Sequence, residues 1–333
     1  MNLARLWYGS HPLSILLAPL SGLFCLAVAA RRYAYRAGLL QSDKLPVPVI
    51  VIGNISVGGT GKTPLVIYVV EALREAGHRP GVVSRGYGGR AATWPQVVNA
   101  DSDPALVGDE PVLIARRAGC PVAVAPRRAA AARRLLAEHG CEVIVCDDGL
   151  QHYALARDLE IAVIDGVRRL GNGRCLPAGP LREPPARLRT VDMIVANGAG
   201  SPDECGMQLT GNTAFPLHDS NGACELGEWR GRTVHGVAGI GNPERFFAHL
   251  RGQGLNVVEH PFPDHHRFNA ADVRFADDLP VLMTEKDAVK CRGFTQPQLW
   301  YVPVTAQLDT ACEQQMQRLH EQAPGAHHHH QRN

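Results

Sequence analysis

The chain has 333 residues, of which 45% are hydrophobic, and its acidic and basic residues balance to a formal net charge of +2. This length and apolar content suit two domains, or one large α/β unit with additions, and they exclude a chain that is disordered throughout. The near-neutral charge gives no support to nucleic-acid binding.

The first predicted element is an apolar segment at residues 12–30, which contains no charged side chain. A cluster of three arginines follows it, at Arg31, Arg32 and Arg36. A secretory signal carries its positive charges before the apolar run, so the order here disfavours a cleaved signal. We expect residues 1–40 to form a membrane-associated helix, with the chain after Arg31 on the cytoplasmic side. Pro19 and Gly22 interrupt a segment barely long enough to cross a bilayer, so a span, a partly embedded helix and a buried core helix all remain open.

Strands and helices are expected to alternate from residue 47 to residue 197. Apolar, β-branched runs predict strands at 47–52, 80–84, 121–125, 142–146, 161–165 and 193–197, and the segments between them predict helices at 64–76, 109–118 and 127–138. This alternation is typical of an α/β fold with a mainly parallel sheet.

A second α/β unit is expected beyond a segment rich in Gly, Asn and Ser at 199–231. Its predicted strands lie at 234–240, 280–283 and 299–304, with a helix at 243–251 and a closing helix at 305–322. The predicted domains are an N-terminal helix at 1–40, a larger domain at 41–215, a smaller α/β domain at 216–322 and a polar, His-rich tail at 323–333.

Nine cysteines are spread along the chain without a C-x-x-C pair or zinc-ligand spacing. We therefore expect reduced thiols in a cytosolic compartment. The run His327–His330 lies in the tail and takes no part in the fold prediction.

Residues 53–63, with the sequence GNISVGGTGKT, follow a predicted strand and open a predicted helix. This is the setting of a phosphate-binding loop, or P-loop, in which backbone N–H groups converge on phosphate oxygens. The usual pattern G-x-x-x-x-G-K-[ST] has glycine first, where this chain has Ser56. Lys62 would reach the β- and γ-phosphates of ATP, and the Thr63 hydroxyl would bind Mg²⁺. The predicted ATP-binding residues are Ser56, Val57, Gly58, Gly59, Thr60, Gly61, Lys62 and Thr63.

A P-loop enzyme also needs an acidic residue at the end of a neighbouring strand to hold Mg²⁺. The strand at 142–146 runs into Asp147 and Asp148, and these carboxylates with Thr63 are the predicted metal site. Asp148 could instead orient the attacking group. For His152, in the same segment DDGLQH, a structural hydrogen bond and a role at the phosphates are both open.

Eight motifs occur in order after the apolar N-terminus. They are GNISVGGTGKTP at 53–64, SRGYG at 84–88, GDEP at 108–111, DDGLQH at 147–152, PAGPLREP at 177–184, GIGNP at 239–243, FPDH at 262–265 and TEKD at 284–287. Together with the N-terminal segment, this set covers about residues 1–305 and resembles the lipid A 4'-kinase (tetraacyldisaccharide 4'-kinase) family of Gram-negative bacteria.

The resemblance implies two α/β/α domains that face each other across a cleft, at the cytoplasmic face of the inner membrane. It implies transfer of the γ-phosphate of ATP to the 4'-hydroxyl of a tetraacylated glucosamine disaccharide 1-phosphate, which yields lipid IVA. The expected partners are this acylated lipid and the membrane surface, with no nucleic acid and no obligate protein partner.

The same resemblance implies that Asp109 of GDEP and His265 of FPDH form a catalytic dyad, which removes the proton of the acceptor hydroxyl. An imidazole can accept a proton at neutral pH, and a carboxylate can fix its tautomer. His266 is a rival for His265, and Asp148 is a rival base near the metal. Closure of the two domains is expected to assemble this site.

Four residues are candidates for binding the polar head of the substrate: Arg85, Tyr87, Arg182 and Glu183. Arginine suits this task because its planar guanidinium can donate two hydrogen bonds to a phosphate. The roles of Lys286 and Asp287, at a predicted strand end facing the cleft, stay open.

Two other functions also stay open at this point. A regulatory GTPase would need the guanine-binding motif N/T-K-x-D, whereas in TEKD the lysine directly precedes the aspartate. That function would also leave the apolar N-terminus unexplained. A soluble small-molecule kinase or ligase with the same P-loop would be favoured by soluble behaviour without detergent.

Overall fold

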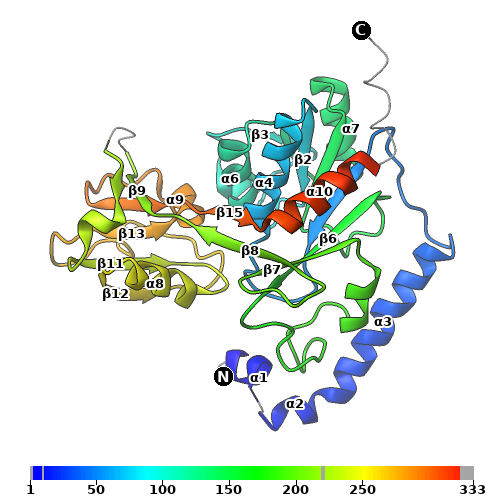
Figure 1. Cartoon of the computed structure of the whole chain (residues 1–333), viewed down its shortest axis with the longest axis horizontal. Coiled ribbons are helices and arrows are strands. Elements are labelled where there is room, and N and C mark those ends of the chain that lie inside the picture. The colour runs from blue at the N-terminus through cyan, green and yellow to red at the C-terminus, as the bar shows by residue number, and fades with distance from the viewer. Residues whose placement is uncertain (1–2, 10, 219–221, 323–333) are drawn as a thin grey trace.

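The structure is a computed structural model that describes residues 3–9, 11–218 and 222–322. Two lobes each surround one β-sheet, and a long N-terminal helix runs along the outside of the larger lobe (Figure 1). The predicted α/β class with mainly parallel strands is confirmed. The predicted tail at 323–333, with its histidine run, lies outside the described residues.

The larger lobe is built on a nine-stranded sheet that is parallel except at its two edges, β15 and β3. In spatial order the strands are β15 (Thr305–Leu308), β8 (Cys205–Thr210), β7 (Met193–Asn197), β6 (Leu159–Asp165), β1 (Val49–Gly53), β5 (Val143–Asp147), β2 (Pro80–Ser84), β4 (Val122–Val124) and β3 (Gln96–Val98). The central strands β1 and β5 are buried along their whole length, as β-branched strands are when helices cover both faces of a sheet. Because Ile52 pairs with Asp147, the P-loop and the Asp147–Asp148 pair leave the sheet at the same edge.

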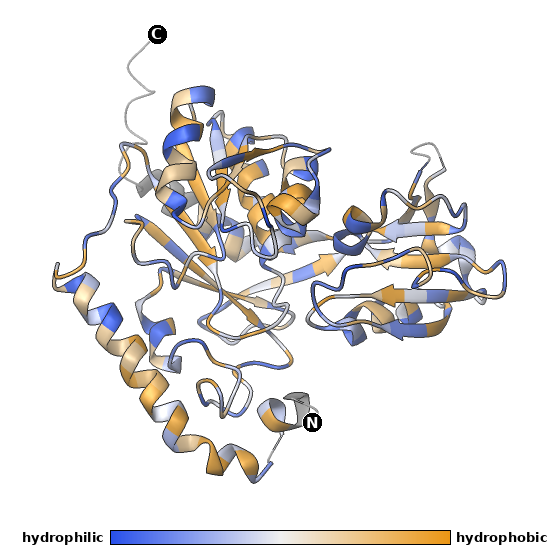
Figure 2. Ribbon diagram, turned by 180° about the vertical axis from the view of Figure 1, so that it is seen from behind, coloured by the Kyte–Doolittle hydropathy of each residue, from blue (hydrophilic) through white to orange (hydrophobic). Residues whose placement is uncertain are grey.

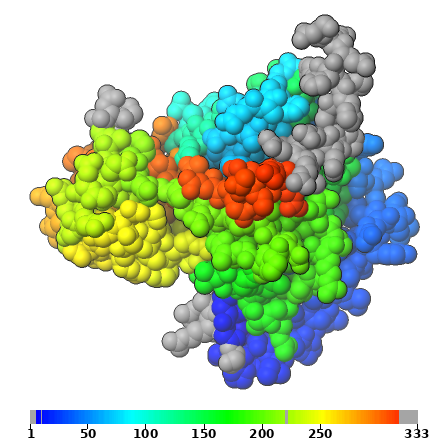
Figure 3. Space-filling model, viewed as in Figure 1, coloured from blue at the N-terminus to red at the C-terminus, as the bar shows by residue number. Residues whose placement is uncertain are grey.

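Helices cover both faces of this sheet. One hydrophobic cluster includes residues of α4 (Lys62–Glu75), α6 (Asp109–Arg117) and α10 (Thr310–Gln322), and the other includes residues of α7 (Arg128–His139). In Figure 3, α10 lies in red across the outside of the lobe. The short helices α5 (Pro104–Val107) and η1 (Pro185–Thr190) lie in connecting segments.

The smaller lobe is built on a six-stranded sheet. In spatial order its strands are β10 (Cys224–Glu225), β9 (Thr213–Pro216), β14 (Leu299–Val302), β13 (Val281–Thr284), β11 (Thr233–Ala238) and β12 (Asn256–Pro261). Helix α8 (Pro243–Gly252) and the turn η2 (Leu226–Trp229) pack into one hydrophobic cluster, and α9 (Glu285–Cys291) packs into the other. The last four strands in this order are parallel, so their carboxyl ends also share one edge.

Two connections cross between the lobes side by side. β8 leads into β9 through residues 211–212, and β14 leads into β15 through residues 303–304. Because β15 pairs with β8 and β9 pairs with β14, both antiparallel, the crossing is a two-stranded ribbon (Figure 1).

The strand pairing differs from the sequence-based expectation for one domain boundary and for one helix. The division was expected after residue 215, but β9 already belongs to the smaller sheet. The single helix expected at 305–322 is wrong for its first residues, because 305–308 pairs with β8 and the helix begins at Thr310. Alternating buried and exposed side chains in β15 fit a strand at the edge of the larger sheet.

The N-terminal segment folds into α1 (Leu3–Tyr8), α2 (Leu13–Leu16) and α3 (Ala18–Arg36). Of the residues of α3 only Ser21 is buried, and its hydroxyl donates to the carbonyl of Cys175 at 2.8 Å. In Figure 2 most of the ribbon of α3 has the colour of hydrophobic residues, with hydrophilic residues between them. The large apolar side chains that it and α2 expose are Ile15, Leu16, Leu20, Leu23, Leu26 and Tyr33. These apolar side chains are not covered by the described residues, although α3 also contacts the larger lobe, and membrane association remains a prediction.

Among the helices of the described residues, none is both long enough and apolar enough to traverse a bilayer.

A pair of leucine substitutions tests this burial pattern. Leu250→Ala, in the core of the smaller lobe, should lower the free energy of unfolding by about 2–5 kcal/mol, because it leaves a cavity. Leu23→Ala is the matched control: this side chain of α3 is 64% exposed, so the change should stay within about 0.5 kcal/mol. Urea unfolding followed by tryptophan fluorescence measures both. A large loss of stability in Leu23→Ala would mean that α3 is covered by the folded protein.

Candidate phosphotransfer site

The P-loop lies between β1 and α4, and side-chain hydrogen bonds from neighbouring residues hold its conformation. Gly61 immediately precedes α4 with a φ of 94°, and a Cβ there would lie 2.4 Å from Nδ2 of Asn197, so no other residue fits. Asn197 donates to the carbonyl of Thr60 at 3.0 Å, and Asn54 donates to the Thr60 hydroxyl at 3.2 Å. The loop and the first turn of α4 thus present the backbone arrangement that binds phosphate groups.

The P-loop lysine faces a carboxylate from the neighbouring strand. Lys62 Nζ lies 3.6 Å from Asp148 Oδ1, and Arg182 donates to Asp148 Oδ2 at 3.0 Å. Burial alone would raise the pKa of Asp148, but these two cations hold it at about 2. Asp148 is therefore a carboxylate with its charge already balanced, in a left-handed backbone conformation (φ 47°).

The adjacent carboxylate, Asp147, is in the opposite electrostatic situation. It is buried at the end of β5, and Ser84 donates to its Oδ2 at 3.1 Å. Its Oδ1 has no hydrogen-bond partner among the described residues. Burial, with the charges of Glu110 and Asp148 added, raises the pKa of Asp147 to about 7. A buried acceptor that lacks a partner and lies among carboxylates is a place where a divalent cation fits.

Among the described residues, no three His, Cys, Asp or Glu side chains come together as a metal site. The predicted metal site has two carboxylates, Asp147 and Asp148, together with the Thr63 hydroxyl, and it stays a prediction. Mg²⁺ is commonly held this way, by one or two carboxylates together with phosphate oxygens and water.

The second pair of predicted catalytic residues meets across the two lobes. Asp109 begins α6 in the larger lobe, and His265 follows β12 in the smaller one, yet His265 Nδ1 lies 3.1 Å from Asp109 Oδ2. The hydrogen bond to Asp109 raises the pKa of His265 above its ordinary value. Burial alone would raise the pKa of Asp109, but His265 and two nearby lysines lower it to about 2.

The two lysines near Asp109 both belong to α9 of the smaller lobe. Lys286 Nζ lies 3.0 Å from Glu110, 3.3 Å from Asp264 and 4.0 Å from Asp109. Lys290 lies 3.9 Å from Asp109 and 2.7 Å from Asp287. Burial opposes the charge of Lys286, but the three carboxylates raise its pKa. Lys286 thus joins the lobes by ion pairs, while Asp287 is buried and also accepts from the backbone N–H of Gly239 at 2.9 Å.

The four candidates for substrate binding fall into different places. Tyr87 is exposed, and its ring centre lies 5.1 Å from that of His265. Arg85, two residues earlier in the sequence, is also exposed to solvent. Arg182 lies at the Asp148 side of the site. Glu183 is 1% exposed and accepts hydrogen bonds from Gln151 and Tyr153, so its observed contacts hold the fold together.

His266, the rival of His265, and His152 differ in their surroundings. His266 lies 3.0 Å from Asp272, within its own loop, so His265 is the histidine that reaches Asp109. Burial and the neighbouring Arg128 and Arg157 lower the pKa of His152 to about 4. His152 is therefore neutral at physiological pH.

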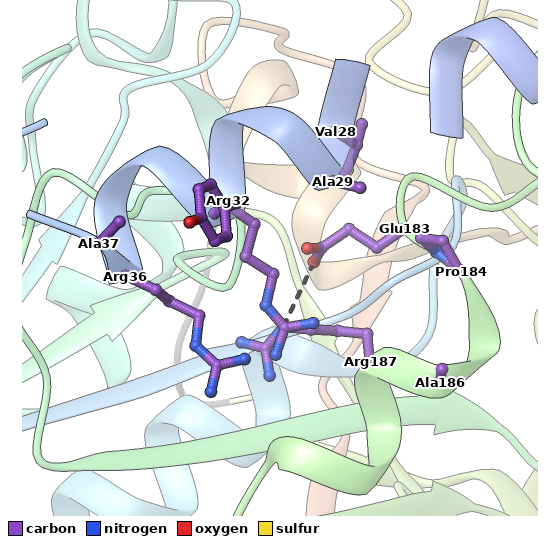
Figure 4. Close-up of a pocket in the computed structure, with 10 residues that line it drawn as sticks. Val28, Ala29, Arg32, Arg36, Ala37, Glu183, Pro184, Ala186 and Arg187 are labelled. Carbon is purple, nitrogen blue, oxygen red and sulfur yellow. Dashed lines mark ion pairs between the residues drawn. The ribbon is translucent and has the colours of Figure 1, made fainter. Parts of the chain in front are cut away.

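A separate cavity of about 640 Å³ opens between α3 and η1. Figure 4 shows Arg32, Arg36 and Arg187 directed toward it, with Val28 and Ala29 on the helix side. Arg187 is buried and paired with Glu160 at 2.6 Å, whereas Arg32 donates to the exposed Thr190 hydroxyl at 2.8 Å. The cavity combines apolar and basic lining.

Several residues of the site were not predicted from the sequence. Asn197 ends β7 just as Asp147 ends β5, so the rule that ligands bind at the carboxyl ends of parallel strands could have singled it out. Arg128, which donates to the carbonyl of Asp148 at 2.8 Å, and Ser84 are identified only by their contacts.

Comparison with known proteins gives consistent matches. The family model described as tetraacyldisaccharide-1-P 4'-kinase matches residues 13–321. The tetraacyldisaccharide 4'-kinase of Nitrosococcus oceani is 55% identical over 319 residues, which are 96% of this chain and 94% of that protein. That of Alkalilimnicola ehrlichii is 55% identical over 309 residues, 91% of this chain and 93% of that protein. Among solved structures, the "apo" form of LpxK from Aquifex aeolicus in complex with ATP superposes with a TM-score of 0.75 at 28% identity, covering 92% of this chain and 99% of that one.

The Asp109–His265 contact predicts a measurable pKa. In the wild-type protein the pKa of His265 should lie above 6.5, and in Asp109→Asn it should fall, because the carboxylate that stabilises the imidazolium is gone. Titration of the imidazole proton resonances by NMR measures both values, with His265→Asn identifying the signal. Asp277→Asn, which removes a carboxylate from another histidine, His235, should leave the pKa of His265 unchanged. An unaltered pKa in Asp109→Asn would show that the pair does not form.

Proposed function

The chain belongs to the tetraacyldisaccharide-1-P 4'-kinase family, and we propose that Asp109 and His265 activate the acceptor hydroxyl in its reaction. That reaction is transfer of the γ-phosphate of ATP to the 4'-hydroxyl of a tetraacylated glucosamine disaccharide 1-phosphate, which gives lipid IVA. The observation that carries the mechanism is the pairing of Asp109 with His265 from the opposite lobe, beside Glu110, whose charge acts on Asp147 at the end of β5.

His265 is the better base among the candidates. Its Nδ1–H is donated to Asp109, which leaves Nε2 as the basic nitrogen for the sugar hydroxyl. Asp109 and Asp148 both have a pKa of about 2, so neither binds a proton readily near neutral pH. A base with a pKa near the working pH combines the correct protonation state with useful basicity.

The P-loop supplies the positioning and charge stabilisation that phosphoryl transfer requires. Backbone N–H groups of residues 56–63 surround the phosphates, and Lys62 moves its charge from Asp148 to the β- and γ-phosphates. Asp147, Asp148 and Thr63 are the residues that would hold Mg²⁺, which, when bound, neutralises charge on the phosphate oxygens. Arg182 stays beside Asp148 and preserves the charge balance there.

An acylated acceptor does not leave the bilayer, so the enzyme must work at its surface. The exposed apolar side of α3 supports burial in the membrane interface, with the arginines that follow residue 30 near anionic headgroups. The basic cavity beside Arg32 and Arg36 adds positive charge at the same end of α3. We therefore place the protein at the cytoplasmic face of the inner membrane, with α3 lying in the interface.

The central experiment is an ATP assay with purified tetraacyl disaccharide 1-phosphate in mixed micelles. Transfer of the γ-phosphate to this lipid supports the proposed reaction. Hydrolysis of GTP in preference to ATP would instead indicate a switch GTPase. Transfer from ATP to a soluble acceptor alone would indicate a small-molecule kinase.

Two substitutions assign the chemistry. Lys62→Ala should abolish phosphoryl transfer, because the charge that reaches the phosphates is lost. Its far-UV circular dichroism spectrum should stay that of the wild type.

His265→Ala should lower kcat by about 10²-fold or more, the usual contribution of a general base. An unchanged kcat in His265→Ala would give the role of base to Asp148.

A third set of variants tests the membrane surface. Leu20→Gln combined with Leu23→Gln and Leu26→Gln should reduce binding to vesicles that contain anionic lipid, because it removes exposed apolar area from α3. Leu106→Gln, which alters an exposed leucine of the larger lobe, is the matched control and should bind as the wild type does. Co-sedimentation measures the bound fraction. Equal binding of the triple variant and the control would contradict the assignment of α3.

A further inference from the structure

The motif GIGNP at 239–243 has no role in the chemistry above, yet it touches the P-loop. It forms the turn between β11 and α8 of the smaller lobe. A Cβ on Gly241 would lie 2.3 Å from the backbone nitrogen of Gly59 and 3.0 Å from the carbonyl carbon of Gly58. The two backbones are therefore in contact, with no room for a side chain between them.

A loop of the larger lobe holds this turn in place. Arg168 donates to the carbonyl of Gly241 at 3.1 Å and to Oδ1 of Asn242 at 2.7 Å. Its guanidinium also lies over the ring of Tyr8, 5.2 Å from the ring centre. These contacts use a charged donor, which makes them stronger than neutral hydrogen bonds.

The same loop forms a second bond to the smaller lobe. Asp165, buried at the end of β6, accepts from the backbone N–H groups of Val167 and Arg168, both at 2.9 Å. Its other oxygen accepts from Arg245 of α8 at 2.8 Å. Asp165 thus shapes the loop that carries Arg168 and also binds the helix that follows Gly241.

We propose that Arg168, Asp165, Gly241, Asn242 and Arg245 form a latch that closes the smaller lobe onto the P-loop. The movement that brings His265 to Asp109 then also fixes the outer turn of the P-loop at Gly58 and Gly59. The base and the phosphate-binding loop become competent in the same closed state. The five latch residues are positioning residues, since they act through the P-loop and the lobes. The inference rests on the proposed function, because its readout is ATP-dependent transfer.

Gly241→Ala is the sharpest test of the latch. Gly241 is not in a positive-φ conformation, so alanine is compatible with its backbone, and the obstacle to its Cβ is the P-loop of the other lobe. The variant should lower kcat/KM for ATP by about tenfold or more, the effect expected when one well-packed contact is disrupted. It should also reduce the rise in melting temperature that a non-hydrolysable ATP analogue gives. Gly252→Ala, at the other end of α8 with open space around it, is the control and should match the wild type in both measurements.

Arg168→Met tests the same latch without adding an atom at the contact with the P-loop, and it serves equally if Gly241→Ala does not fold. It should lower kcat/KM for ATP by a similar factor, and Arg168→Lys should recover part of the loss. Because both variants open one contact, the double variant should be no worse than the more affected single variant, within about twofold. Losses that multiply, or a kcat/KM for ATP in Gly241→Ala equal to that of Gly252→Ala, would overturn the latch. If the wild type itself transfers no phosphate from ATP to the lipid acceptor, the proposed function fails instead.

Discussion

Asp109 is a buried carboxylate of the larger lobe, and its cationic partners among the described residues, His265, Lys286 and Lys290, belong to the smaller lobe. His265 hydrogen-bonds to it, and Lys286 and Lys290 lie within 4.0 Å of it. An ionised carboxylate in this position without those cations would be costly, because burial disfavours charge that has no partner. Ionisation of Asp109 and association of the two lobes are therefore linked. The proposed catalytic dyad is therefore also part of what holds the two lobes together.

The two carboxylates beside the P-loop, Asp147 and Asp148, differ in their partners. Asp148 is neutralised by Lys62 and Arg182, while Asp147 keeps one buried oxygen without a partner among the described residues. Asp148 thus forms an ion pair with the P-loop lysine, whereas Asp147 is influenced by the charge of Lys62 but has no hydrogen-bond partner at Oδ1 among the described residues. If Mg²⁺ and ATP bind as proposed, the phosphates would compete with Asp148 for Lys62, and the cation would give Asp147 Oδ1 a partner. Both changes would favour joint binding of nucleotide and cation.

The elements best predicted from the sequence were those with a strong local signal. The P-loop, its flanking strand and helix, and the strand ending at Asp147 lie within two residues of their expected bounds, because buried β-branched runs and glycine turns are recognisable locally. The Asp109–His265 pair was expected from a family resemblance, since 156 residues separate its members and no local pattern joins them. The role of Glu183 at the substrate stays a prediction, and its hydrogen bonds with Gln151 and Tyr153 could be known only from the fold. The helix expected at 305–322 was wrong for its first residues because β15 exists only by pairing with β8, about a hundred residues earlier.

The paired connections between the lobes also constrain how the chain can fold. The whole smaller lobe is an insertion between two strands that pair with each other, so the sheet of the larger lobe stays incomplete until residues 305–308 have been synthesised. During translation the smaller lobe can form its own core first, and the last strand and α10 then join a sheet that began near residue 49. A ribosome-bound chain that ends before residue 305 would expose an edge at β8 with nothing to cover it. Completion of the larger sheet therefore depends on residues 305–308, which follow every proposed catalytic residue in the sequence.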